Sequence, residues 1–308
     1  MPLITTLIII GFIGYYFYSK RITFGSKSVD YSFGDQDIQK IKSKIEEKEY
    51  TSAEYLIQQL NGDDLRQTID HVTINGSENV LLQWKEDAPD SQIVDLFLGV
   101  YYMHQASINR GYGFAGEISG KQKDLFTDYS DQAVELLKKV DLDEVINVET
   151  YSRLVRILGS TGDHKGAQHY FEKCLDVDPK HLWAHIEYAE FSQPKWGGDM
   201  ETTNQFIDDL TEEPLVNQVI YLKLVWDSVL SKENLFGGTM GDLKEQAKAL
   251  LFEIDAEINN QPHSSIQRYV LYNYMTVVAE EFGIKVLNQK YNKLMNNYFT
   301  LYPFGIMK

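Results

Sequence analysis

The chain has little of several residues that mark common protein classes. Its single cysteine, Cys174, excludes an internal disulfide and a cysteine-rich zinc site. With 7 prolines and 21 glycines among 308 residues, beside 20 tyrosines and 15 phenylalanines, the chain is neither collagenous nor of low complexity. Basic residues are also outnumbered, because 29 Lys and Arg against 45 Asp and Glu give a net charge of -16. Nucleic acids and anionic lipid surfaces are therefore not the expected partners.

One uncharged hydrophobic run stands at the N-terminus. Leu3 to Tyr18 spans about 24 Å as a helix, slightly less than the roughly 30 Å hydrocarbon core of a bilayer, and the flanking residues bring it near the lower limit for a spanning helix. A cleaved signal peptide needs a basic residue before the run and small residues at the cleavage site, and the chain has neither. Residues 1–21 are therefore predicted to be a transmembrane anchor, with a signal peptide and a buried helix as the alternatives.

The charges around this run predict its orientation. Lys20, Arg21 and Lys27 lie on its C-terminal side, and no basic residue precedes it. The positive-inside rule then places the large C-terminal domain in the cytoplasm. A single free cysteine agrees with that reducing compartment. The sequence thus predicts a single-pass membrane protein.

The rest of the chain has helical periodicity and little strand signal. Residues 22–35 are aperiodic and are predicted to be a linker. Apolar residues then recur at three- and four-residue spacing, with Asn, Gly and Pro at the expected helix boundaries. Helices are predicted around Ile38–Ile45, from Ser52 to Asn61, and at 91–110, 127–139, 145–160, 164–176, 180–192, 199–210, 214–231, 241–259, 264–282 and 285–299. Such a chain is all-α, either a helix bundle or a solenoid.

Self-similarity favours the solenoid. Residues 151–179 match much of the tetratricopeptide (TPR) pattern, in which small and large side chains alternate so that paired helices pack closely. Val155 departs from this pattern, which prefers Gly or Ala there. The matching positions are Tyr151, Leu154, Ala167, Phe171, Cys174 and Pro179, with Ala133 and Leu137 standing 34 residues before Ala167 and Phe171. We predict a TPR-like α-solenoid of antiparallel helix pairs over residues 36–210, continued by further helix pairs in residues 211–308.

Several landmarks occur together within residues 36–210. They are Trp84 with Pro89 and Ser91, Arg110-Gly111 at the end of a long helix, the pair that ends at Pro179, and the stretch Pro194-Lys195-Trp196-Gly197-Gly198. In these features the chain resembles the bacterial TPR-related family named domain of unknown function 4034, and the last stretch is the most specific. The resemblance implies a helical-repeat protein near a membrane anchor, here in the bacterial inner membrane. It implies no catalytic residue.

Three patterns suggest chemistry, and each has a more ordinary explanation. Gly111–Gly116 spells G-x-G-x-x-G, but a helix rather than a strand precedes it, which is typical of a loop and not of a dinucleotide site. His181 and His185 share a helix face, yet Leu182 stands where a zinc protease has Glu. Cys174 occupies a packing position of the repeat. We therefore predict no catalytic residue, no cofactor and no metal site.

The loop Gln193–Met200 is the strongest candidate for binding. Its Trp196 has two interpretations, an indole that fills the gap between adjacent helix pairs or an exposed aromatic anchor for a partner. The loop from Arg110 to Asp124 is expected to form the rim of the same surface, because solenoid insertions tend to lie on the binding face. The predicted protein-binding residues are Arg110, Tyr112, Phe114, Lys195 and Trp196.

These expectations combine into a functional hypothesis. The chain is predicted to be a membrane-anchored, non-catalytic helical-repeat protein that binds another protein through an acidic, aromatic-containing groove. Because an acidic surface attracts opposite charge, the expected partner is a basic protein or a basic segment. The alternative is an immunity protein whose acidic surface blocks the basic cleft of a secreted bacterial toxin. A hydrolase built from the histidines and carboxylates is the third hypothesis.

Overall fold

Short polar side chains cap the helices of this chain. In the computed structural model, Asp35 accepts a hydrogen bond from the backbone N–H of Asp37 at 2.8 Å. Ser119 and Gln122 form a reciprocal capping box at the start of a later helix. Gly162, with a φ of 87°, ends another helix in the left-handed conformation that favours glycine. Local chemistry therefore sets several of the helix boundaries.

The structure describes residues 31–74, 76–111, 118–210, 214–258, 265–295, 298 and 300, and within these ranges it contains helices and no strand. The helices are α2 (Gln36–Glu46), α3 (Tyr50–Ile57), α4 (Gly62–Ile74), α5 (Glu78–Asp87), α6 (Gln92–Arg110), α7 (Gly120–Leu137), α8 (Glu144–Thr161), α9 (His164–Val177), α10 (Leu182–Phe191), α11 (Met200–Asp208), α12 (Pro214–Ser231), α13 (Met240–Glu257), α14 (Ser265–Glu281) and α15 (Lys285–Met295). A short 3₁₀ helix, η1 (Pro194–Trp196), lies between α10 and α11. The predicted all-α class is confirmed.

The predicted membrane anchor, residues 1–21, lies outside the described part of the chain. Among the described helices, none combines the length and the apolar character that crossing a bilayer requires. The predicted linker 22–35 is described from Tyr31 onward, and there Tyr31 and Ser32 are buried. Gln67 of α4 donates a hydrogen bond to the carbonyl oxygen of Tyr31. This end of the linker segment therefore packs against the helices.

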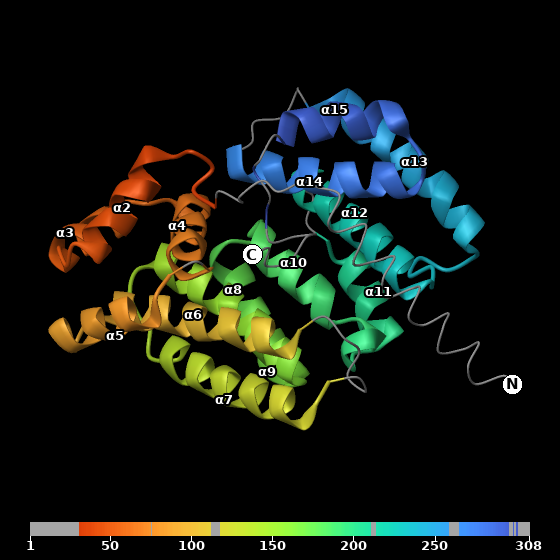
Figure 1. Ribbon diagram of the computed structural model, residues 1–308. Helices are drawn as coiled ribbons and strands as arrows, with labels where there is room; N and C mark the ends of the chain where they lie inside the picture. Colours follow the sequence, from red (N-terminus) through yellow and green to blue (C-terminus); the bar gives the residue numbers. More distant parts are fainter. Residues whose placement is uncertain are drawn as a thin grey trace, which may run out of the picture. The chain divides into compact units, whose positions relative to one another are not determined.

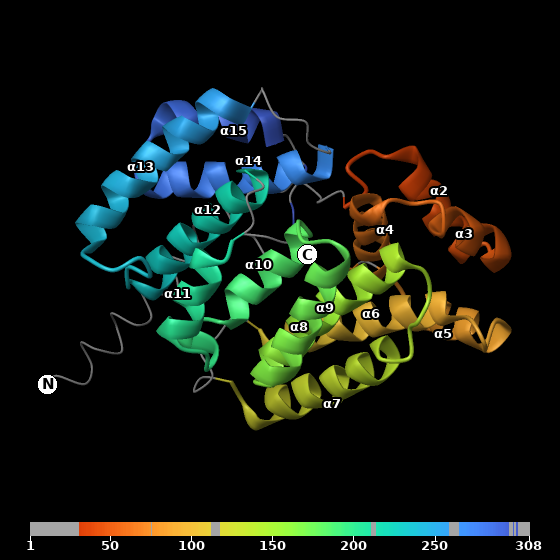
Figure 2. The same ribbon diagram turned by 180° about the vertical axis from the view of Figure 1, so that it is seen from behind.

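Consecutive helices pack in pairs. The most extensive contacts join α6 with α7, α8 with α9, and α14 with α15, and each pair lies side by side in both views (Figures 1 and 2). Helices α6 and α7 approach closely because α6 has a glycine at the contact. A Cβ on Gly99 would lie 2.8 Å from Cγ of Leu137 on α7. A larger residue at this position would force the two helices apart.

Helices that are next but one along the chain also contact one another. Helix α4 packs on α6, α8 on α10, α10 on α12, and α12 on α14. Helix α4 additionally contacts α14. A further contact between the two ends is aromatic, because the ring centroid of Phe33 lies 5.2 Å from that of Tyr269 and 5.5 Å from that of Tyr298. All these helices belong to one compact unit, Asp30–Met307.

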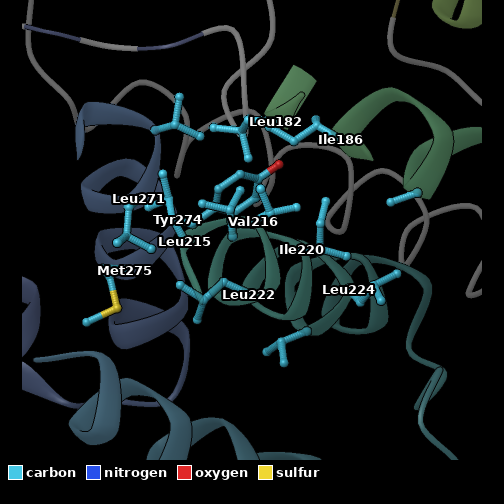
Figure 3. Packing of buried hydrophobic residues seen from close by; sticks show 14 of the residues in the cluster. Leu182, Ile186, Leu215, Val216, Ile220, Leu222, Leu224, Leu271, Tyr274 and Met275 are labelled. Carbon is cyan, nitrogen blue, oxygen red and sulfur yellow. The ribbon is translucent and has the colours of Figure 1, made fainter. Parts of the chain in front are cut away.

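Two hydrophobic clusters form the core. One joins residues of α2 to α9 and the other joins residues of α8 to α15, so the clusters meet at α8 and α9. In the second cluster, side chains of three helices meet, and the ring of Tyr274 from α14 lies among Leu182 and Ile186 of α10 and Val216 and Ile220 of α12 (Figure 3). This cluster crosses the predicted boundary between residues 210 and 211. The C-terminal helices are therefore continuous with the preceding core.

Most positions of the predicted repeat are interior. Ala133, Leu137, Leu154, Ala167, Phe171 and Cys174 are buried, Tyr151 is partly buried and Pro179 is exposed. The small residue that the repeat prefers at Val155 occurs one turn later, at Gly159. A Cβ on Gly159 would lie 2.5 Å from Cβ of Phe191 on α10. This close approach therefore joins α8 to α10 and not to its own partner α9.

Candidate functional site

The loop after α10 is a tight turn that depends on two glycines. Gly197 has a φ of 90°, a conformation that residues with a side chain rarely adopt. A Cβ on Gly198 would lie 2.0 Å from the carbonyl oxygen of Ser192, so only glycine fits there. The turn places Lys195 and Trp196 at the end of α10.

The indole of Trp196 is half-buried and has three neighbours. Its Nε1 donates a hydrogen bond to Oε1 of Glu190 at 2.6 Å. Its ring lies 5.1 Å from that of Phe191 between centroids, and Cζ of Arg110 lies 4.9 Å from the indole centroid in a cation–π contact. Because Arg110 ends α6, two predicted binding residues that are distant in sequence come together. The surface formed by Arg110, Lys195 and Trp196 is here called the ledge.

A network of charged side chains, the outer network, supports the ledge. It consists of Glu190, Lys195, Lys223 and Asp227. Lys223 and Asp227 stand one turn apart on α12, with Nζ 2.7 Å from Oδ2, and Lys223 also pairs with Glu190. Lys195 bridges the two carboxylates, at 3.2 Å from Glu190 and 3.1 Å from Asp227. Two cations thus balance two anions.

In the outer network, ion pairing shifts the pKa values of Glu190 and Lys223 more than burial does. Burial disfavours the charged form of Glu190, but Lys223 and Lys195 hold the pKa of Glu190 well below its ordinary value. Burial likewise disfavours the charged form of Lys223, but Asp227 and Glu190 raise its pKa above its ordinary value. Glu190 and Lys223 are therefore both charged at neutral pH, and the ledge rests on a fixed ion pair.

A second and fully buried network, the inner network, consists of Arg66, Asp70, Glu149, Arg153 and Glu187. Arg66 reaches from α4 to Oε1 of Glu187 on α10 at 2.9 Å and to Oε1 of Glu149 on α8 at 3.5 Å. Arg153 of α8 holds Oε1 of Glu149 at 2.5 Å and Oδ1 of Asp70 at 2.7 Å. Buried charges are costly unless they are paired, so these contacts fix α4, α8 and α10 in one arrangement.

The acids of the inner network differ in their pKa values. Burial raises the pKa of Glu149, although Arg153 and Arg66 act against this shift. For Asp70, Arg153 and Arg66 outweigh burial, and its pKa lies below its ordinary value. His104 of α6, 3.5 Å from Oδ1 of Asp70, is neutral because burial lowers its pKa to about 3. Of these two acids, Glu149 is therefore the easier to protonate.

Helix α10 connects both networks to the ledge. Glu187 belongs to the inner network and Glu190 to the outer network, and the two stand three residues apart, on neighbouring positions of the helix surface. Trp183, one turn before Glu187, lies under the guanidinium of Arg66, with 4.5 Å between Cζ and the ring centroid. One face of α10 is therefore fixed by polar contacts, and Trp196 is held at the end of this helix.

The histidines that share a helix face have structural contacts. His181 caps α10, its Nδ1 accepts the backbone N–H of Ala184 at 3.2 Å, and burial lowers its pKa to about 3. Nδ1 of His185 lies 3.0 Å from the carbonyl oxygen of His181. Burial raises the pKa of the Cys174 thiol, which disfavours the nucleophilic thiolate. In the described ranges no three His, Cys, Asp or Glu residues are grouped so that they could hold a metal ion.

The glycine-rich loop is described only at its start. Gly111 follows α6 directly with a φ of 71°, so a helix precedes the G-x-G-x-x-G motif. Tyr112 and Phe114 lie outside the described residues, and their role in binding stays a prediction. The next described helix, α7, begins after Ser119.

Two open hollows occur elsewhere on the surface. One, of about 320 Å³, lies between the end of α3 and the start of α8, and the other, of about 390 Å³, lies between α7 and the end of α8. Their acidic lining residues are Asp143 and Glu144 in the first, and Asp131, Glu135 and Asp163 in the second. No aromatic side chain of the described residues lines either hollow. Neither of these two hollows therefore combines acidic with aromatic lining residues.

Sequence reasoning missed the charged residues that support the ledge. Lys223 and Asp227 stand four residues apart in the otherwise uncharged helix α12, and Glu190 follows a mostly apolar stretch of α10. Charged residues inside an apolar helix indicate internal ion pairs, because an unpaired charge is not buried. This pattern predicts that the three residues pair, but it does not identify which helix supplies the partner.

One protein family matches part of the chain, and the description of that family names no activity. Residues 118–219 match the family described as Domain of unknown function (DUF4034), from just before α7 into α12, which includes the Trp196 loop. No curated protein and no solved structure matches the chain. The match begins at residue 118, whereas the resemblance in the sequence begins near residue 36. Over residues 118–219, about a third of the chain, the sequence therefore matches the DUF4034 family model.

Proposed function

We propose that this chain is a non-catalytic helical-repeat protein that binds another protein through the ledge. In this proposal the helix pairs form a TPR-like solenoid, and residues 1–21 hold it at a membrane. The observation that carries the proposal is the position of Trp196, whose partly exposed indole is held by Glu190, Phe191 and Arg110. Tryptophan and arginine are the residues most enriched at the energetic centres of protein interfaces.

Charge supports a partner of opposite sign. A net charge of -16 attracts a basic protein over a distance, and acidic residues line both hollows. This attraction is screened beyond about 8 Å at physiological salt. The rate of association with the partner should therefore fall as ionic strength rises.

A photo-crosslinking amino acid in place of Lys195 tests the proposal in the native host. We expect an adduct of defined mass from position 195 and none from position 286, where Val286 is 65% exposed on α15. Trp196→Ala should abolish the adduct, and Trp196→Phe should keep part of it, because a ring still packs on Phe191. Equal adducts from both positions, or none from position 195 in a protein present at normal levels, would contradict the proposal.

Membrane attachment has its own test. Deletion of residues 1–21 should move the protein from the membrane fraction to the soluble fraction. A reporter fused after Lys308 should be inactive when it is alkaline phosphatase, which works only outside the cytoplasm. An unchanged membrane fraction after the deletion would refute the anchor.

A further inference from the structure

Arg110 has contacts unlike those of the other cations near the ledge. It is half-buried at the end of α6, and its Nη1 donates a hydrogen bond to the carbonyl oxygen of Gly111 at 3.3 Å. In the described part of the chain no carboxylate pairs with it, and its Nε and Nη2 donate to no described residue. Lys195 and Lys223, in contrast, each contact two carboxylates. Among the described residues, Arg110 is thus a cation whose Nε and Nη2 have no acceptor.

The charge balance of the outer network sharpens this contrast. Glu190 and Asp227 are matched by Lys195 and Lys223, so no carboxylate of the network is left over for Arg110. Burial lowers the pKa of Arg110, and no acidic group acts in the other direction. At Arg110 a net-acidic chain therefore carries a positive charge that no described carboxylate neutralises.

The contact with Trp196 determines which N–H groups of Arg110 can bind a ligand. The cation–π contact holds the guanidinium of Arg110 against the indole face. Its Nε and Nη2 donate to no described residue, and a guanidinium can bind a carboxylate with two parallel hydrogen bonds. A half-buried guanidinium without an anion has lost part of its hydration without full compensation. A carboxylate that docks at Nε and Nη2 would restore both the hydrogen bonds and the charge balance.

We propose that Arg110, held in a cation–π contact with Trp196, is the anchor for an Asp or Glu side chain of the partner protein, next to an apolar residue that contacts the indole. This inference rests on the proposed protein-binding function and names the chemistry of the contact. The net charge of the chain attracts a basic partner at long range, whereas Arg110 selects one acidic side chain at short range. Long-range charge and local pairing thus have opposite signs.

A displayed library of random peptides, selected on the full-length protein in detergent, tests the inference. We expect the enriched peptides to contain Asp or Glu beside an apolar residue. The most enriched peptide, once synthesised, should bind roughly tenfold or more weakly to Arg110→Met than to the unchanged protein, because a bidentate ion pair is lost. Arg110→Lys should lie between the two, because it keeps the charge and loses the planar fork.

Two controls keep the result independent of folding. Replacing the acid of the peptide by Asn or Gln leaves the protein unchanged, and it should weaken binding as much as Arg110→Met does. Lys121→Met removes an exposed cation from the start of α7 and should change the affinity by less than about twofold.

The outcomes separate the two proposals. Enriched peptides that are basic, or that bind Arg110→Met and the amide peptide as well as the originals, would overturn this inference and leave the proposed binding function intact. A selection that enriches nothing over the detergent-only control would overturn both.

Discussion

At the scale of residues, the pairing within the inner network determines how much stability the protein loses when one of its charged side chains is replaced. Removing one partner of a buried ion pair typically costs about 3–5 kcal/mol, because the other charge stays buried and unpaired. Arg153 holds two carboxylates, those of Asp70 and Glu149. Burial already raises the pKa of Glu149 toward its neutral form. The two residues of one ion pair should therefore respond differently to substitution.

We expect Arg153→Met to lower the free energy of unfolding by about 3–5 kcal/mol, because it leaves Asp70 and Glu149 without their guanidinium. Glu149→Gln keeps an oxygen that accepts from Arg153 and should cost only about 1 kcal/mol. Urea unfolding followed by circular dichroism measures both values. A greater loss for Glu149→Gln than for Arg153→Met would refute this order.

Buried neutral histidines should make the fold sensitive to acid. His104 and His181 have a pKa of about 3 in the folded protein, against about 6.5 in an unfolded chain. Because only the unfolded state takes up these protons, the stabilising contribution is complete above pH 6.5 and is lost progressively as the pH falls toward 3. His181 alone should account for about 2 kcal/mol of the loss in the free energy of unfolding between pH 7 and pH 5.

His181→Asn isolates this effect, because asparagine also caps helices but does not titrate. The variant should show a smaller difference in stability between pH 7 and pH 5 than the unchanged protein, by about the same 2 kcal/mol. His169→Asn, at an exposed position of α9, is the matched control and should keep the full difference. An identical pH dependence for His181→Asn and the unchanged protein would mean that the folded state accepts this proton without cost.

At the scale of elements, close approach between helices depends on residues without a side chain. Gly159→Ala places a Cβ 2.5 Å from Cβ of Phe191, so α8 and α10 must separate. Overpacking of this kind costs about 1–3 kcal/mol. Gly120→Ala, at a helical position with nothing within 4 Å, should leave the stability unchanged or raise it. Thermal unfolding of the two variants compares them directly, and equal melting temperatures would show that the α8–α10 contact adjusts freely.

The sequence predicts a helix where the apolar residues recur with a clear helical period, and it misses a helix whose buried residues are polar. Helix α12 has the predicted bounds 214–231, because an initial proline and a long apolar pattern mark it. Helices α4 and α5 were not predicted. Helix α4 buries Arg66, Gln67 and Asp70 on faces where an amphipathic helix has apolar residues, so its periodicity is weak.

The sequence predicts only those parts of the candidate site that depend on residues close together in the chain. The turn around Trp196 was identified from Pro194 and the two glycines that follow, which act through their own backbone. The cation–π contact of Arg110 with Trp196 and the ion pairs from α12 join segments that are distant in sequence. No pattern within one segment specifies such contacts, since they depend on how the helices pack.

At the scale of the whole molecule, the contact between α4 and α14 changes how the described helices should unfold. In an open solenoid each repeat touches only its neighbours, and the ends can unfold separately. Here α4 also packs on α14, and the two hydrophobic clusters meet at α8 and α9. We therefore expect one cooperative transition for the helices of the unit Asp30–Met307.

Tryptophan fluorescence can report on the two clusters separately. Trp84 lies in the first cluster, and Trp226 packs against the second. One variant keeps only Trp84 and another keeps only Trp226, with the other tryptophans changed to phenylalanine. Within each variant, the urea midpoint from tryptophan fluorescence should equal the midpoint from circular dichroism. Midpoints that differ between the fluorescence and dichroism of one variant would show that the two clusters unfold independently.

The ion pairs that support Trp196 fix its indole before a ligand binds. The indole donates to Glu190, and Glu190 is itself paired with the buried Lys223, so the ring cannot turn away without breaking a charged contact. A ligand that docks there would find the surface already in its binding geometry and would cost the protein little conformational entropy. Its affinity would then depend on complementary shape more than on induced adjustment.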